Sequence, residues 1–214
     1  MFITPIEGKT LYPVFSYRSA GLDPLTGDPR GYLNGEISKD YDRMIADSLQ
    51  YLNFHGTALP PYYGTFNNSF SYNGFNLNVS LLFKWGHYFR KESIAYSSLY
   101  NTWVGHGDFV KRWQKEGDER ETTVPSMTFP ADENRDNFYL KSEANIGKGD
   151  LIRIQSIRLS YNLIKKSKYP INANVFIGAN NLGVIWKKAK SGLDPDFLGM
   201  PNPRVFTVGV NFQL

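Results

Sequence analysis

The chain has 214 residues, a formal net charge of +4 and no cysteine. The lack of cysteine excludes disulfides, thiolate metal sites and a cysteine nucleophile, and the basic residues form no single stripe of the kind that binds nucleic acid. No run of 18 apolar residues predicts a transmembrane helix. Aromatic residues make up 15% of the chain, which suits a membrane β-barrel, because only alternate strand residues face lipid. A large soluble β-sandwich can have the same composition.

Residues 1–62 contain no long alternating segment. We interpret them mainly as an extracellular segment that leads into the strands, with room for a partial strand. Residues 1–5 lack the basic region and apolar core of a secretory signal. If the chain is an envelope protein, we expect its export signal to lie upstream of Met1 in a longer parent.

The clearest pattern is a hairpin over residues 63–85. Residues 63–72 place aromatic side chains on one face, Asn73 and Gly74 form a strong two-residue turn signal, and residues 75–85 alternate with period two. One face of the second strand is apolar and the other is polar. The apolar face carries Phe75, Leu77, Val79, Leu81 and Phe83, and the polar face carries Asn76, Asn78 and Lys84.

Three further strands are predicted at 151–163, 171–181 and 204–214. All the predicted strands have about ten residues or more, whereas soluble strands average about five or six and a tilted membrane strand needs about 9–11. The apolar face of the last strand carries Val208, Val210 and Phe212, and the polar face of the strand before it carries Asn172 and Asn174.

The strand at 151–163 changes the parity of its apolar positions. Ile152 and Ile154 are even-numbered, whereas Ile157 and the apolar residues after it are odd-numbered. One extra residue in a strand shifts its alternation by one position. We therefore predict a β-bulge near residues 155–156.

The connections between these strands alternate in length. Short turns at 73–74 and about 164–170 alternate with long loops at 86–150 and 183–203, as the short periplasmic turns and long external loops of outer-membrane barrels do. The sequence thus predicts an all-β fold, an antiparallel meander of long strands that forms the C-terminal part of a large transmembrane β-barrel. Its apolar face would meet lipid and its polar face the lumen. A secreted carbohydrate-binding β-sandwich predicts the same alternation.

Several segments also resemble the SusC/RagA family of TonB-linked outer-membrane proteins. They occur in the family's order and spacing from about residue 12 to residue 214, although each is weak alone. The segments are FSYRSAGLDPLTGDP at 15–29, HGTALPPYYG at 55–64, GDLIRIQSIRLSY at 149–161, GANNL at 178–182, GLDP at 192–195 and PNPR at 201–204.

This resemblance implies uptake of oligosaccharides, peptides or related nutrients through a plugged barrel of about 22 strands. It implies contact with outer-membrane lipid, the rest of the parent barrel and its plug, a SusD-like lipoprotein lid, and the TonB complex through an N-terminal part that this chain lacks. It places the protein in the outer membrane of a Gram-negative, Bacteroidetes-like cell. We expect a fragment that does not transport alone, because five strands cannot close a barrel. Another TonB-dependent receptor, for siderophores for example, is the alternative within this class.

The sequence predicts no catalytic residues, no metal site and no cofactor, and we expect the protein not to be an enzyme. His55, His87 and His106 lack metal-ligand spacing. Aromatic side chains in the long 86–150 loop suit stacking against sugars or peptide side chains, and the alternative is that they pack the loop onto itself or onto a lid. These ligand-binding candidates are Tyr96, Tyr100, Trp103, Phe109 and Trp113.

Overall fold

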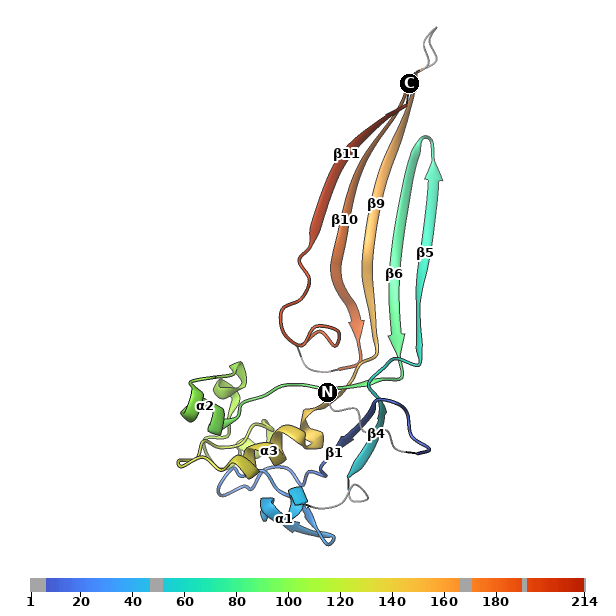
Figure 1. Cartoon of the computed structure of the whole chain (residues 1–214). Coiled ribbons are helices and arrows are strands. Elements are labelled where there is room, and N and C mark those ends of the chain that lie inside the picture. The colour runs from blue at the N-terminus through green and yellow to red at the C-terminus, as the bar shows by residue number, and fades with distance from the viewer. Residues whose placement is uncertain (1–6, 47–51, 166–170, 190–191, 214) are drawn as a thin grey trace. The chain divides into compact units, whose positions relative to one another are not determined.

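The computed structural model describes residues 7–46, 52–165, 171–189 and 192–213 (Figure 1). These residues form two compact units. Unit 1 takes its residues from Met1–Ala58 and Tyr88–Gly147, and unit 2 takes its residues from Leu59–His87 and Lys148–Leu214. The chain therefore passes between the two units three times.

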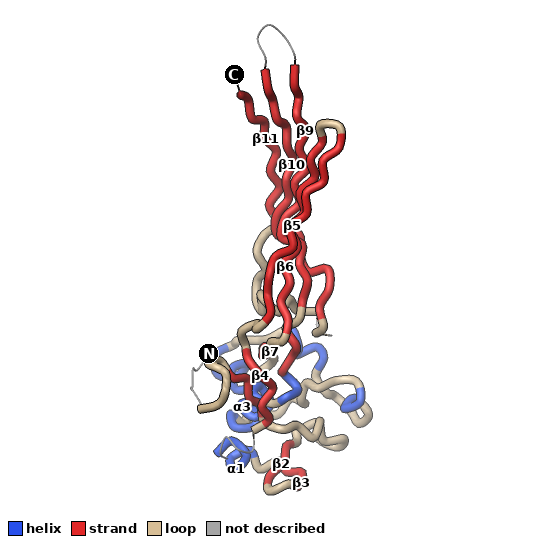
Figure 2. Tube along the Cα trace, turned by 90° about the vertical axis from the view of Figure 1, so that its right-hand side faces the viewer, coloured by secondary structure: helices blue, strands red, loops and turns tan. Residues whose placement is uncertain are grey.

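Unit 2 is built on one five-stranded antiparallel sheet, in the order β11-β10-β9-β6-β5. Figure 2 shows these strands running side by side. Because neighbours in the sheet follow chain order, the predicted antiparallel meander of long strands is confirmed. The strands are β5 (Tyr62–Tyr72), β6 (Phe75–Trp85), β9 (Leu151–Lys165), β10 (Ile171–Lys187) and β11 (Val205–Gln213).

The turn between β5 and β6 has the backbone that its sequence predicts. Asn73 and Gly74 both have positive φ, at 47° and 87°, and the flanking residues Tyr72 and Phe75 are paired. A two-residue turn of this kind needs positive φ at both positions, which asparagine and glycine tolerate best. The turn therefore fixes the register of the whole hairpin.

The predicted bulge in β9 is confirmed. Ser80 of β6 pairs with Ser156, but the next residue, Leu81, pairs with Ile154, so that Gln155 is the extra residue. The bulge brings Ile152 and Ile154 onto the same face as the odd-numbered apolar residues that follow. One continuous apolar face results.

The C-terminal part of β10 differs from the sequence interpretation. We expected a loop from residue 183, but β10 continues to Lys187. Asn181 and Gly183 have positive φ, which is why their sequence predicts a strand end. Pairing with β9 nevertheless resumes at Gly183 after an irregularity, so the turn-like residues lie inside the strand.

Unit 1 contains short elements around two small apolar clusters. One consists of Tyr41, Met44 and Phe138, and the other of Ile94, Tyr96 and Val124. The strands are β1 (Pro13–Ser16), β2 (Gly31–Leu33), β3 (Glu36–Ser38), β4 (Asn53–Thr57), β7 (Tyr88–Arg90) and β8 (Ile146–Lys148). The helices are α1 (Tyr41–Ala46), α2 (Tyr96–Thr102), α3 (Glu133–Lys141), η2 (Gly107–Lys111), η3 (Asp118–Arg120) and η4 (Glu143–Asn145).

The 86–150 segment, expected as a loop, holds most of these helices and packs with residues from the first 58. In the described part of the chain, no helix is long and apolar enough to cross a bilayer.

Candidate functional site

One face of the unit 2 sheet is mainly apolar across all five strands. Residues paired across an antiparallel sheet project from the same face, and Val79, Ile157 and Ala179 form one such row. Much of this face is open, with 73% of Val208 exposed. The eight residues expected to face lipid all lie on it, namely Phe75, Leu77, Val79, Leu81, Phe83, Val208, Val210 and Phe212.

The opposite face carries a ladder of short polar side chains. Ser69 donates to Asn78 Oδ1 at 2.6 Å, Ser71 donates to Asn76 Oδ1 at 2.7 Å, and the Asn174 amide donates to Asn162 Oδ1 at 2.6 Å. Asn76, Asn78, Lys84 and Asn174, all expected to face the lumen, lie on this face. The side chain of Asn172, the fifth expected lumen residue, lies outside what the structure describes.

The second GLDP segment packs against one end of this polar face. Arg153 Nη2 lies 2.7 Å and 2.8 Å from the two oxygens of Asp194 and 3.2 Å from Asp196 Oδ2. Lys84 Nζ donates to Asp196 Oδ1 at 2.8 Å, and Lys187 Nζ to the carbonyl of Leu193 at 2.6 Å. Side chains of three strands, β6, β9 and β10, thus bind the connection after β10. Strand periodicity does not predict these contacts.

The aromatic candidates in unit 1 do not gather around one cavity. Tyr96 is 1% exposed and its hydroxyl donates to the Pro125 carbonyl at 2.7 Å. Tyr100 and Phe109 are partly buried against the same cluster, and the Trp113 ring lies against Gly27. Trp103 differs, because it is 89% exposed. It is the C-cap residue of α2, with a φ of 58°. Of the five, Trp103 offers the most accessible ring.

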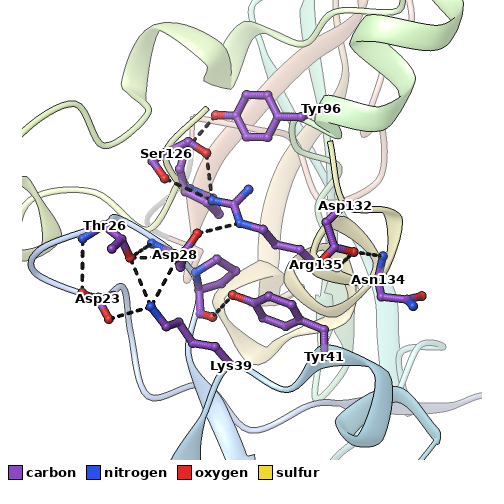
Figure 3. A network of polar contacts seen from close by, with 12 residues as sticks. Asp23, Thr26, Asp28, Lys39, Tyr41, Tyr96, Ser126, Asp132, Asn134 and Arg135 are labelled. Carbon is purple, nitrogen blue, oxygen red and sulfur yellow. Dashed lines mark hydrogen bonds and ion pairs between the residues drawn. The ribbon is translucent and has the colours of Figure 1, made fainter. Parts of the chain in front are cut away.

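The first GLDP segment, at residues 21–29, forms a polar network with α3 (Figure 3). Arg135 Nε donates to Asp28 Oδ1 at 2.9 Å, and its Nη2 donates to the carbonyl and hydroxyl oxygens of Ser126. Lys39 Nζ lies 3.1 Å from Asp23 and 3.4 Å from Asp28. In each segment an aspartate thus pairs with an arginine that is distant in sequence, Asp28 with Arg135 and Asp194 with Arg153.

His55 gives unit 1 a pH-dependent contact. Its Nε2 lies 2.7 Å from Ser16 Oγ, and burial lowers its pKa below 6.5, with Glu143 opposing and Arg90 reinforcing the shift. The folded state thus favours neutral His55, and the unfolded chain binds the proton more readily. Stability should fall as the pH drops from about 6.5 through the lowered pKa.

We expect His55→Gln to reduce this pH dependence. The measurement is the urea midpoint of the wild type and the variant at pH 8, 6 and 5. Burial also lowers the pKa of His87, so the wild-type slope has a second source, and the comparison between variants isolates His55. An unchanged slope in His55→Gln would contradict the assignment.

Within the described ranges, no group of three or more acidic or histidine side chains is placed to hold a metal ion. His106 instead accepts a hydrogen bond from the Asp108 backbone at the start of η2. His55 and His87 lie in different units.

A meander of long antiparallel strands with one open apolar face and one polar face is the architecture of the wall of a transmembrane β-barrel. No protein-family model and no curated protein matches the chain. Among solved structures it is similar to the RagAB peptide transporter, with a TM-score of 0.62 and 20% identity over 92% of this chain and 22% of that chain.

Two further RagAB structures agree. The peptide importer in its open-open state has a TM-score of 0.62 and 19% identity over 94% of this chain, and in its closed-closed state the values are 0.64, 18% and 92%; in both, 22% of the other chain is covered. At such low identities, the TM-scores establish similarity of fold. The SusC/RagA resemblance is therefore confirmed at the level of the fold, and the chain spans 22% of the length of these relatives.

Proposed function

We propose that this chain is part of a TonB-dependent outer-membrane importer of oligosaccharides, peptides or related nutrients, with the unit 2 sheet as a section of the barrel wall. The observation that carries the proposal is the open apolar face opposite a polar ladder. In this arrangement the apolar face meets lipid and the polar face lines the lumen. Unit 1 belongs to the extracellular part, and the chain does not transport alone.

The exposure of the apolar face favours lipid over a second sheet. In a β-sandwich the inner face of each sheet is covered by the other, about 10 Å away. Here the side chains of Phe70, Phe206 and Phe212 are all more than half exposed. Contiguous apolar surface on this scale marks a binding or membrane surface.

The sheet edges support a larger assembly. β5 and β11 are the outer strands, and neither has a second neighbour in the described part of the chain. In lipid each unsatisfied backbone group costs several kcal/mol, so that a β-sheet is stable there only as a closed barrel. Further strands of a parent barrel, which the greater length of the RagAB chains accommodates, would pair with both edges.

The proposed partners follow from the SusC/RagA resemblance. They are outer-membrane lipid, the remaining barrel and plug, a SusD-like lipoprotein lid, and the TonB complex through an N-terminal part, in a Bacteroidetes-like cell. The exposed ring of Trp103 is the ligand-contact candidate that unit 1 presents best, to cargo or to the lid.

Site-specific labelling tests which face meets lipid. The chain has no cysteine, so a cysteine introduced into it reports one position once any cysteine elsewhere in the parent protein has been replaced by serine. Val208→Cys and Thr207→Cys are a matched pair, adjacent in β11 but on opposite faces. With a bimane label and brominated lipid, we expect strong quenching at position 208 and little at 207. Equal quenching at both positions would contradict the barrel proposal.

A further inference from the structure

The five strands of the unit 2 sheet have an unbalanced charge. They contain no aspartate or glutamate but five basic residues, four of which have described side chains. Register places all four on the polar face, because each pairs with a residue of that face. They are Lys84, Arg153, Arg158 and Lys187.

Three of these four cationic side chains bind acceptors on the connection that follows β10. Arg153 and Lys84 form ion pairs with Asp194 and Asp196, and Lys187 donates to a backbone carbonyl of the same segment. The protein thus supplies its own acceptors at that end of the face. The charge is largely neutralised there.

Arg158 stands apart from this arrangement. It is exposed and lies near the middle of β9, and the described residues give it no ion pair. Its guanidinium carbon lies 3.8 Å from the centre of the Phe176 ring. Stacking holds the guanidinium plane and leaves its N–H donors free at the rim, the geometry that suits a carboxylate.

The neighbours of Arg158 leave room for a ligand. Its paired residues are Asn78 on β6 and Gly178 on β10, and Gly178 has no side chain to cover it. The Asn78 oxygen accepts from Ser69 at 2.6 Å, which directs the amide N–H donors of Asn78 elsewhere. Cation and neutral donors therefore share one open area with no acidic group on the strands.

We infer that this polar face favours anionic cargo and that Arg158 binds its carboxylate groups, as in acidic peptides. The inference rests on the proposed function, because the polar face meets cargo only where it lines the lumen and the proposed plug does not cover it. An exposed guanidinium without an ion pair attracts anionic groups and repels cationic ones. A neutral or basic peptide gains nothing from Arg158.

Uptake of length-matched fluorescent peptides tests the inference in the protein in its natural gene context. The panel contains one glutamate-rich, one glutamine-rich and one lysine-rich peptide. We expect the wild type to favour the acidic peptide and Arg158→Gln to reduce its uptake roughly five- to twenty-fold, the range for losing an exposed charge-assisted contact, while glutamine-peptide uptake is unchanged. Arg158→Lys should retain part of the preference.

Arg204→Gln is the matched control, since it removes an exposed arginine outside the strands, and it should leave the preference intact. Equal losses for acidic and neutral peptides would mean that Arg158 supports the barrel or contacts the plug, and would overturn the inference. So would a wild type that imports all three peptides equally, although the proposed function would then stand. Import of none of them would count against the proposed function itself.

Discussion

Val208→Arg should destabilise the protein in lipid by about 2–4 kcal/mol, the cost of an arginine near the midplane on the lipid face of a barrel. Val208 lies within β11, paired with Ile177, on the continuous apolar face. A guanidinium at this position must either lose its hydration or distort the bilayer around it. We expect Val79→Arg, on the same face of β6, to have a similar effect.

The exposure of Val208 makes this result discriminating. In a water-soluble protein, a substitution at a side chain that is 73% exposed usually changes stability by about 0.5 kcal/mol or less. The two environments thus predict effects that differ several-fold. Urea titration in phospholipid vesicles, followed by tryptophan fluorescence, measures the difference.

Thr207→Arg is the control for this experiment. Thr207 is the neighbour of Val208 and lies on the polar face, paired with Gly178. If the polar face lines the lumen as proposed, an arginine there meets water, so we expect little loss. If both variants lose the same stability, or neither loses any, the lipid assignment of the apolar face fails.

Sequence patterning predicts the sheet well because each strand contributes a local signal. Period-two alternation identified all five strands, and the reversed parity around Ile154 and Ile157 predicted a bulge near residues 155–156, which the structure places at Gln155. Asn181 and Gly183 misled the interpretation of β10, because residues that favour positive φ are normal at strand ends and rarer inside paired strands.

Unit 1 is less predictable because its contacts are distant in sequence. Its strands have at most five residues, too few for a periodic pattern. Tyr96 illustrates the consequence, since its residue type suggested ligand contact whereas its ring is buried in a core cluster. The polar face of the sheet was predicted from parity, but the stacking of Arg158 on Phe176 depends on the register between β9 and β10.

Asp28→Ala should destabilise unit 1 by about 3–5 kcal/mol, since removing one partner of a buried ion pair leaves the other charge uncompensated. Arg135 is 4% exposed and lies 107 residues from Asp28. The lost carboxylate also accepts from Thr26 and Lys39. The loop at residues 21–29 should therefore open together with the start of α3.

Hydrogen exchange measured by mass spectrometry separates this effect from changes in the sheet. In Asp28→Ala we expect faster exchange in peptides from unit 1 and unchanged exchange in β9 and β10. Combining Asp28→Ala with Arg135→Met should recover part of the loss, because the buried charge is then gone as well.

Arg120→Ala is the control variant. It removes an arginine whose side chain is 86% exposed and pairs with Glu119 at 3.7 Å, and exposed pairs contribute about 1 kcal/mol or less. If Arg120→Ala accelerated exchange as much as Asp28→Ala, the network would have no special role in holding unit 1 together.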